Sequence, residues 1–339
     1  MKICLPTFFI FILLGIGCSR TITNSIPENT PESNFEYLWQ EYDHFYAAFE
    51  LKGVDWDSVY AIYRPQVTSQ TTDEDLFLIM SNMLATLRDG HVNLYTPLGD
   101  YSYTAWWDQY PRNYDSEILR IQYGIVRRTN NPIQYRLLDE QIGYVHISSF
   151  SNYSGGNWGR DIEIALREMG NIQGLIVDVR NNGGGSGRNA KDVASRFADE
   201  ERLFRHVQFR SGPNHDDFTQ YFSDSFEPKG NITFTRPVVL LTNRRVFSAA
   251  EAFVLMMRTL PQVTVVGDTT GGGSGNPVYR ELPNGWTFRV PRWQAFTPNF
   301  EPFEGVGLAP DVWVSTPDAL LESGTDRIFE TAIEILVKK

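Results

Sequence analysis

Apolar segments that alternate with helical segments constrain the fold of this chain more than any other feature of its sequence. The apolar runs lie at residues 175–179, 238–241 and 263–266. Helical patterns fall around them, at about 157–169, 188–199 and 248–260. Strands without a polar face are typical of a parallel sheet that is buried on both sides. The alternation therefore predicts an α/β layer, which further strands at 135–138 and 142–147 extend.

The residues ahead of this layer predict a small helical domain at 33–95. Apolar and aromatic side chains recur at helical spacing in three segments, at 35–53, 54–65 and 72–90. The last segment begins at the capping residue Thr72 and ends at Gly90, a residue suited to a helix C-terminus.

The remaining residues, 96–339, are predicted to form the core. They include a hairpin at 278–290 and a C-terminal helix at about 319–336, which is interrupted near Gly324. The stretch 97–132 is aromatic and irregular, and its sequence predicts no particular element.

The N-terminus predicts export. Residues 1–18 combine a charged start, an apolar run and small residues, as in a secretion signal. Cys18 follows those small residues as in the lipobox of bacterial lipoproteins, which predicts cleavage before Cys18 and acylation of its thiol. An ordinary secretory signal is the alternative. The other of the two cysteines, Cys4, would leave with the signal, so the mature chain has no internal disulfide. Residues 19–32 predict a flexible polar tether.

Composition excludes several classes of partner. The formal net charge of −11, without a dense basic run, argues against binding to nucleic acid. No apolar segment beyond the N-terminus is long enough to span a bilayer. Paired His or Cys ligand spacings are missing, so neither a metal nor another cofactor is expected. We expect a lipoprotein of the periplasm or outer membrane, attached to the membrane only through its lipid anchor.

Ser248 is the first candidate for chemistry. It follows the predicted strand 238–241 after a short polar turn and stands at the start of the predicted helix 248–260. The unpaired N–H groups at a helix N-terminus can stabilise an oxyanion that forms when a hydroxyl attacks a carbonyl. A plain helix N-cap is the alternative role for a serine at this place.

A glycine run, 183–185, follows another predicted strand and precedes a helix. Glycines there let backbone N–H groups approach a negative oxygen. Phosphate binding is one interpretation, although no Lys-Ser/Thr pair closes the run. An oxyanion hole is the second interpretation, and a simple loop is the third.

A serine nucleophile needs a base, and histidine suits this work near neutral pH. His44 falls inside a predicted helix and His146 inside a predicted strand, so both are expected to be structural. His206 and His215 lie in a polar stretch without a recognisable context. His91 follows the helix-ending Gly90 and precedes a strand, a place from which a side chain can point into a cleft.

Five motifs together carry a resemblance to a known family. They are LRDGHV at 87–92, IGYVHISSF at 142–150, DVRNNGGG at 178–185, FSAAE at 247–251 and EGVGLAPD at 304–311. Their order resembles the C-terminal processing, or tail-specific, proteases, which include the tricorn protease core and the retinoid-binding interphotoreceptor modules. The resemblance runs from about Phe35 to the C-terminus. It implies a crotonase-like or ClpP-like α/β core preceded by a helical domain. The segment 97–138 is too short for a PDZ insert.

The resemblance also distinguishes two mechanisms. Bacterial Ser/Lys members carry the lysine in a Gly-Lys-Gly context after the nucleophile, but no lysine lies between Ser248 and Lys338 here. The tricorn-like branch uses histidine instead. It implies that Ser248 is the nucleophile, His91 the base and Glu304 the acid that orients it. It further implies an oxyanion hole from the N–H groups of Gly184 and Ala249.

One departure from the tricorn pattern concerns the orientation of His91. The tricorn core has a serine before its histidine, whereas this chain has Gly90. Either Glu304 reaches the imidazole directly, or a water or Asp89 takes the place of that serine. A solvated loop carboxylate is the alternative role for Glu304, and a helix-end residue is the favoured role for Asp89.

Three further polar residues near these motifs are expected to be structural. Glu251, one turn into the Ser248 helix, is predicted to hold a nearby donor. Asp178 and Arg180 are predicted to brace the glycine run rather than to react.

The leading hypothesis is a serine peptidase that hydrolyses polypeptides through an acyl-enzyme. A binding module of the same fold, without chemistry and with a hydrophobic ligand or peptide as partner, is the alternative. A crotonase-type acyl-CoA enzyme fits the core but not the serine-led helix or the export signal. Because family members assemble, a homo-oligomer is compatible with this hypothesis.

Overall fold

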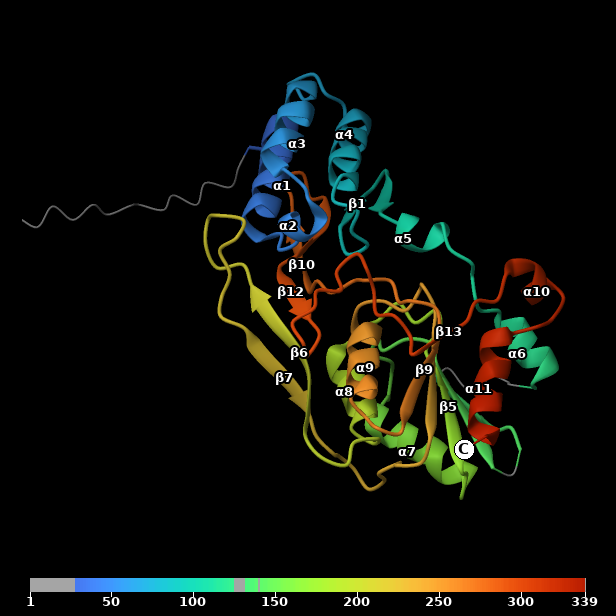
Figure 1. Cartoon of the computed structure of the whole chain (residues 1–339). Coiled ribbons are helices and arrows are strands. Elements are labelled where there is room, and N and C mark those ends of the chain that lie inside the picture. The colour runs from blue at the N-terminus through green and yellow to red at the C-terminus, as the bar shows by residue number, and fades with distance from the viewer. Residues whose placement is uncertain (1–27, 125–131, 140, 339) are drawn as a thin grey trace, which may run out of the picture.

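The computed structural model describes residues 28–124, 132–139 and 141–338 (Figure 1). The predicted signal segment, Cys18 and most of the predicted tether lie outside these ranges. Within them, no helix is both long and apolar enough to cross a membrane.

A six-stranded sheet forms the centre of the molecule, in the order β13-β9-β8-β5-β4-β3. Its strands are β3 (Ile133–Leu137), β4 (Ile142–Ile147), β5 (Gly174–Asp178), β8 (Val238–Thr242), β9 (Val263–Gly267) and β13 (Val312–Trp313). Neighbours from β4 to β13 run parallel, and only β3 is antiparallel to its neighbour β4. The predicted α/β layer is thus confirmed.

Helices cover both faces of this sheet, which explains why its strands lack a polar side. On one face lie α7 (Trp158–Met169), α8 (Gly187–Ala194) and α9 (Ala249–Arg258), and on the other α6 (Ser116–Gln122) and α11 (Arg327–Val337) (Figure 1).

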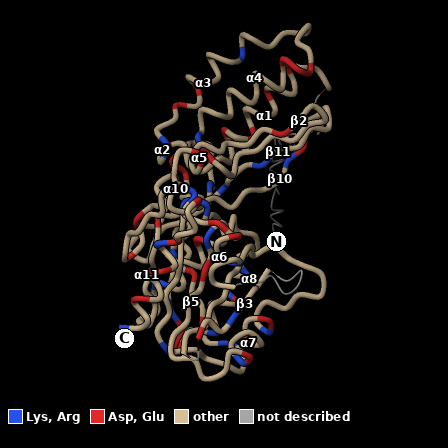
Figure 2. Tube along the Cα trace, turned by 90° about the vertical axis from the view of Figure 1, so that its right-hand side faces the viewer, with Lys and Arg blue, Asp and Glu red and all other residues tan. Residues whose placement is uncertain are grey.

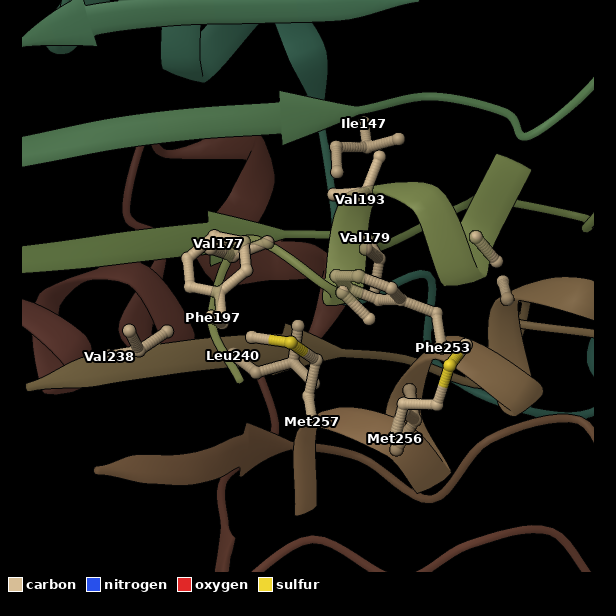
Figure 3. Packing of buried hydrophobic residues seen from close by; sticks show 14 of the residues in the cluster. Ile147, Val177, Val179, Val193, Phe197, Val238, Leu240, Phe253, Met256 and Met257 are labelled. Atoms are coloured by element: carbon tan, nitrogen blue, oxygen red, sulfur yellow. The ribbon is translucent and has the colours of Figure 1, made fainter. Parts of the chain in front are cut away.

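Side chains of one strand alternate between the two faces. On the first face, Val177 and Leu240 pack in one core with Phe253 and Met257 of α9 (Figure 3). On the second face, Ile176 packs in another core with residues of α11.

A helical part lies above the sheet, as seen in Figures 1 and 2. It contains α1 (Pro31–Phe45), α2 (Phe49–Lys52), α3 (Trp56–Tyr63), a short 3-10 turn (Arg64–Gln66) and α4 (Asp73–Ala85). Tyr42 and Trp56 are completely buried in its aromatic core. Acidic and basic residues are interspersed along both parts of the chain (Figure 2).

A hairpin from late in the chain completes the helical part. Strands β10 (Pro277–Glu281) and β11 (Thr287–Pro291) join β1 (Asn93–Thr96) and β2 (Gly99–Ser102) in a sheet of order β10-β11-β1-β2. Phe288 and Val290 of β11 are fully buried in the same core as Tyr42 and Trp56. The core of the helical part therefore includes residues from the segment beyond residue 95.

A third sheet, of order β12-β6-β7, is not predicted by the sequence. Its strands are β6 (Arg202–Phe209), β7 (Phe222–Phe226) and β12 (Trp293–Phe296). The register of β6 against β7 shifts between Leu203 and Arg205. Such a bulge moves residues from one face to the other, so the sequence of β6 shows no clean alternation. The short helices α5 (Ala105–Asp108) and α10 (Asp318–Glu322) complete the described elements.

Candidate active site

Ser248 stands at a sharp turn between β8 and α9. Its φ is 58° and its ψ is −123°, a backbone conformation that residues with a side chain rarely adopt. Strain of this kind in a serine at a strand-to-helix turn is typical of a nucleophile elbow, which exposes the hydroxyl. An ordinary N-cap has extended backbone angles instead. The geometry of Ser248 therefore goes beyond the needs of a helix cap.

Glu251 holds this turn against a glycine loop. One carboxylate oxygen accepts hydrogen bonds from the Ser248 N–H at 3.0 Å and the Gly273 N–H at 2.7 Å. The other accepts from the Thr270 hydroxyl at 2.6 Å and the Gly272 N–H at 2.8 Å. Burial raises the pKa of Glu251 to about 7, although the hydrogen bonds from Thr270, Gly273 and Gly272 act to lower it. The predicted structural role of Glu251 is confirmed.

Gly184 approaches Ser248 more closely than any other residue type would allow. A Cβ on Gly184 would lie 2.8 Å from both the Phe247 carbonyl and the Ser248 Cβ, and 3.0 Å from the Ala249 nitrogen. Its φ of 103° also favours glycine. The Gly184 N–H donates to Asn182 Oδ1 at 2.9 Å. The glycine run and the start of α9 thus meet at Ser248. The Gly184 N–H is already bonded to the Asn182 side chain.

A buried ion cluster fixes the strand end that carries the glycine run. The Arg180 guanidinium lies 2.7 Å from Asp178 and 2.8 Å from Asp326, and all three side chains are fully buried. The Tyr144 hydroxyl also donates to Asp178, at 3.0 Å. Burial would raise the pKa of Asp178, but Arg180 outweighs it and lowers that pKa. Asp178 and Arg180 brace the loop, as predicted.

His91 comes from the helical part and is buried. Helix α4 ends at Ala85, earlier than the predicted end at Gly90, and Arg88 adopts a positive φ of 48° in the turn that follows. The His91 N–H donates to Asp89 Oδ1 at 2.7 Å, and the Tyr46 hydroxyl holds Asp89 Oδ2 at 2.9 Å. Asp89 thus fixes the backbone of this turn.

The imidazole of His91 packs against the Phe247 ring, with 4.6 Å between ring centres. Its Nδ1 is buried without a hydrogen-bond partner in the described part of the chain. Burial lowers the pKa of His91 to about 3, Arg289 and Lys52 lower it further, and Glu304 opposes them. His91 is therefore a neutral imidazole at physiological pH.

Glu304 is buried near His91 but bonds to other groups. Its Oε1 lies 2.9 Å from the Lys52 ammonium. Its Oε2 accepts from the Ser274 N–H at 2.7 Å and the Ser274 hydroxyl at 2.8 Å. The next residue, Gly275, faces the imidazole, because a Cβ there would lie 3.7 Å from His91 Nδ1. Ser274 thus binds Glu304, and the residue that follows it, Gly275, lies near His91 Nδ1.

Ser248 and His91 line one cavity of about 590 Å³. Aromatic rings (Trp106, Trp107, Phe247, Tyr279), two arginines (Arg245, Arg289), Ser151, Asn181 and glycines of the two loops form the rest of its wall. The cavity brings a hydroxyl from the core and an imidazole from the helical part to the same space. A neutral imidazole beside a serine can accept the hydroxyl proton while the oxygen attacks a carbonyl.

The other four histidines contact groups away from this cavity. His44 bonds to the Gln40 carbonyl, His146 lies beside Tyr114, His206 stacks on Phe300 and His215 pairs with Asp43. The predicted structural roles of His44 and His146 agree with these contacts.

Comparison with protein families decides the class of this chain. Residues 141–314, just over half of the 339-residue chain, match the family model described as "Peptidase family S41". The chain belongs to peptidase family S41. Residues 27–85, which include most of the helical part, match the model described as "Tricorn protease C1 domain". The predicted relationship to C-terminal processing proteases is thus confirmed.

Curated relatives of this S41 chain are processing proteases. It is 25% identical over 201 residues to carboxy-terminal processing protease CtpB of Bacillus subtilis, which covers 57% of this chain and 39% of that protein. It is 28% identical over 202 residues to the carboxyl-terminal-processing protease of Synechocystis, covering 58% and 44%. The chain therefore spans less than half the length of these relatives.

Solved structures share the fold over almost the whole chain. A putative peptidase from Parabacteroides merdae is 39% identical, with a TM-score of 0.83 and coverage of 91% of this chain and 97% of that one. Mature CPAF is 10% identical at a TM-score of 0.70, covering 91% and 96%. Tricorn protease is 17% identical at 0.57, covering 91% of this chain and 37% of that one. The predicted α/β core preceded by a helical region is confirmed.

Sequence reasoning missed three residues that shape this site, namely Lys52, Ser274 and Arg289. Lys52 carries no local signal, because it ends a short helix like many surface lysines. Ser274 closes a glycine run, which is a visible pattern, but its bond to Glu304 depends on the tertiary fold. Arg289 lies on the predicted hairpin 278–290, and only the docking of that hairpin brings it to the cavity.

Proposed function

We propose that this chain is a serine peptidase that hydrolyses polypeptides through an acyl-enzyme, with Ser248 as nucleophile and His91 as base. One observation carries the proposal: the strained Ser248 and the neutral, buried His91 line the same cavity. Membership of family S41 gives the class of reaction.

Histidine rather than lysine is the proposed base. The lysines of the described ranges each pair with a carboxylate: Lys52 with Glu304, Lys191 with Asp224, Lys229 with Asp192 and Lys338 with Glu334. None of these four lines the cavity that contains Ser248. A protonated, paired lysine cannot accept the serine proton, whereas the neutral imidazole of His91 can.

The N–H of Ala249 is the main proposed donor to the oxyanion. It belongs to the first turn of α9, where a helix offers no internal acceptor. Gly184 is the proposed second donor, from the loop packed against Ser248. Its N–H would have to leave Asn182 Oδ1 to reach the oxyanion, so Asn182 controls this second donor.

Glu304 is proposed to act on His91 indirectly, without a direct hydrogen bond to the imidazole. Its charge favours the imidazolium that forms when His91 takes the serine proton. Because its two oxygens bind Lys52 and Ser274, the Ser274–Gly275 segment is the proposed connection to Nδ1. In this proposal Ser274 has the role that the serine before the histidine has in the tricorn pattern, which is to connect the glutamate to the imidazole.

Labelling by a fluorophosphonate tests the proposal. The probe should modify Ser248, as mass spectrometry of the peptide can show, and Ser248→Ala should abolish modification. His91→Gln should slow labelling by a factor of at least about 100 while the protein stays folded. If the folded chain does not react and Ser248→Ala changes no peptide cleavage, then the second candidate function, a binding module of the same fold, is correct. The four aromatic rings in the wall of the cavity are the feature that favours that second function.

Export and lipid anchoring at Cys18 are proposed from the sequence alone. Metabolic labelling with a fatty acid in a bacterial host should mark the chain, and Cys18→Ser should remove the label. Release of an unlabelled, processed chain would instead indicate an ordinary secretory signal.

A further inference from the structure

Three aromatic rings stand in series beside Ser248. The Trp106 ring of α5 stacks on the Phe247 ring, with 4.2 Å between ring centres and 22° between ring planes. Phe247 in turn packs against the His91 imidazole, at 4.6 Å between ring centres. The Trp106 carbonyl accepts a hydrogen bond from Arg244 Nε at 3.0 Å, which fixes the backbone of α5 at this residue. The series therefore connects α5 to the proposed base through the residue that precedes the nucleophile.

Glycines surround this stack where a side chain would collide with it. A Cβ on Gly90 would lie 2.5 Å from Trp106 Nε1 and 3.0 Å from Phe247 Cζ. A Cβ on Gly271 would meet both rings still more closely, and one on Gly273 would meet the Phe247 ring. None of these three glycines has a left-handed φ. The space that the rings occupy, rather than the backbone, therefore requires glycine at these positions.

The place of Trp106 explains the departure from the tricorn pattern at residue 90. A serine there, immediately before the histidine, would need the space that the Trp106 ring occupies. The chain has Gly90 instead, and the hydroxyl that binds Glu304 comes from Ser274. Gly90 and Trp106 therefore belong to one arrangement, in which a ring stands where the serine side chain would be.

Packing is the main restraint on the His91 imidazole. Its Nδ1 has no hydrogen-bond partner in the part of the chain that the structure describes, and the residue is only 3% exposed. The bond from the His91 N–H to Asp89 fixes the backbone of the turn and not the ring. A buried side chain without such bonds keeps its rotamer through the atoms packed against it. Phe247 packs against this ring, and Trp106 holds Phe247 in place.

The Trp106–Phe247 pair also divides two cavities. Both rings line the cavity of about 590 Å³ that contains Ser248, and both line a second cavity of about 220 Å³ that contains Lys52 and Glu304. Without the indole the two spaces would join, and water would reach the imidazole from a second side. The indole therefore excludes water from the surroundings of the base.

We propose that Trp106 is a positioning residue of the active site, which holds Phe247 against the His91 imidazole and so fixes the orientation of the base. This inference rests on the proposed peptidase function and adds to it a residue that acts through another side chain. A misplacement of about 1 Å in a reacting group can cost about 100-fold in rate. Loss of the indole should therefore slow the proton transfer from Ser248 more than it weakens binding.

The test measures the rate of fluorophosphonate labelling against probe concentration, which separates the maximal rate from the concentration that gives half of it. Trp106→Ala should lower the maximal rate by a factor of at least about 10 and change the half-saturating concentration by less than about threefold. Trp106→Phe keeps a ring on Phe247 and should retain most of the maximal rate. All rates are corrected for the folded fraction of each variant.

Trp39→Ala is the matched control. Trp39 is partly buried like Trp106 and also stacks on an aromatic ring, that of Trp56, but it lines neither of the two cavities. Its replacement should lower stability without changing the maximal rate of labelling.

Gly90→Ala tests the same ring from the other side. Its Cβ should displace Trp106 and lower the maximal rate by about tenfold. In the Trp106→Ala background the new Cβ has lost its nearest neighbour, so the additional loss should be much smaller. Losses that multiply in the double variant would contradict the inference. Gly90→Ala also covers the case in which Trp106→Ala does not fold.

Nuclear magnetic resonance of the imidazole reports on the base itself. Burial holds the pKa of His91 at about 3, Arg289 and Lys52 act in the same direction, and Glu304 opposes them. These charged groups stay in Trp106→Ala, so a more hydrated imidazole should titrate at a higher pH than in the unmodified chain. The control variant should leave this titration unchanged.

Three results would overturn the inference: an unchanged maximal rate in Trp106→Ala, a change confined to the half-saturating concentration, or an equal loss in Trp39→Ala. A Ser248 that reacts equally in all of these variants leaves the peptidase and removes the role of Trp106. A Ser248 that is unreactive in the unmodified chain removes the peptidase. The packing role of Trp106 then stands or falls with the titration of His91.

Discussion

Lys52 and Glu304 form an ion pair buried between the helical part and the core, with 2.9 Å between Nζ and Oε1. The two side chains are 7% and 3% exposed. Burial alone would lower the pKa of Lys52, but Glu304 and Asp89 together outweigh it and raise that pKa. The pair links α2 to the segment beside His91, so it combines a structural contact with an electrostatic one.

Removing only one partner of this ion pair should lower the stability of the protein. Lys52→Met leaves the Glu304 charge buried without its partner and should lower the free energy of unfolding by about 3–5 kcal/mol. Glu304→Gln should do less harm, and the double variant should be more stable than Lys52→Met alone. Urea unfolding of the four proteins measures the coupling. Additive losses would show that the two residues act independently.

His91 should take up a proton only at a pH that is unusually low for a histidine. Burial holds its pKa at about 3, so nuclear magnetic resonance should show the imidazole neutral at pH 5. The unfolded chain takes up this proton near pH 6.5. The resulting stability is complete above that pH and is lost as pH falls from about 6.5 toward 3.

Replacing His91 by Gln should therefore make the free energy of unfolding less dependent on pH between about 6.5 and 3. His44→Gln, which changes an exposed histidine on α1, is the comparison. An unchanged slope in His91→Gln, or a resonance that titrates near pH 6.5, would contradict the buried neutral state.

Glu251→Gln should disturb the turn at Ser248. A glutamine places an NH₂ group among four donors, so at least one buried N–H loses its acceptor. We expect a loss of about 1–3 kcal/mol in the free energy of unfolding and slower fluorophosphonate labelling. Glu281→Gln, on the exposed side of β10, is the control. Full stability and labelling in Glu251→Gln would mean that the carboxylate does not hold this turn.

Arg180→Met should destabilise the protein by about 3–5 kcal/mol, because Asp178 and Asp326 would keep buried charges without a counterion. Adding Asp178→Asn should recover part of the loss in thermal or urea unfolding. Because Arg180 lowers the pKa of Asp178, the ion pair stabilises the folded chain fully above pH about 3.8, the ordinary pKa of an aspartate. This stabilisation is lost as pH falls through the lower pKa that Asp178 has in the folded state. A harmless Arg180→Met would mean that the cluster does not brace the loop.

Gly184→Ala should abolish labelling even if the chain folds, because the new Cβ would collide with the Ser248 Cβ and the Phe247 carbonyl at 2.8 Å. The positive φ at this position adds strain. Gly187→Ala, where a Cβ meets nothing within 4 Å, is the matched control and should label normally. Normal labelling of Gly184→Ala would show that the loop can retreat from the serine.

The sequence was informative where one residue pattern implied one environment. Uniform apolar runs such as 238–241 predicted the buried parallel strands, and the Pro-Asn-Gly turn predicted the hairpin that became β10 and β11. Neither pattern shows which other segment of the chain a strand or hairpin packs against. The docking of that hairpin on the helical part, and with it the place of Arg289, therefore depends on packing between segments far apart in the chain.

The predictions were weakest where backbone irregularity decides the structure. The bulge in β6 concealed a strand, and the positive φ of Arg88 ends the α4 region earlier than its apolar spacing indicates. Lys52 shows the same limit for charges, because only the fold brings it to Glu304.

The hairpin that completes the helical part has a consequence for how the protein is made. Phe288 and Val290 are synthesised long after the helices whose aromatic side chains they cover. A nascent chain released from the ribosome before residue 291 therefore carries α1–α4 with an uncovered apolar surface, which chaperones bind. The part that carries His91, the proposed base, is thus completed only after the hairpin late in the chain has been synthesised.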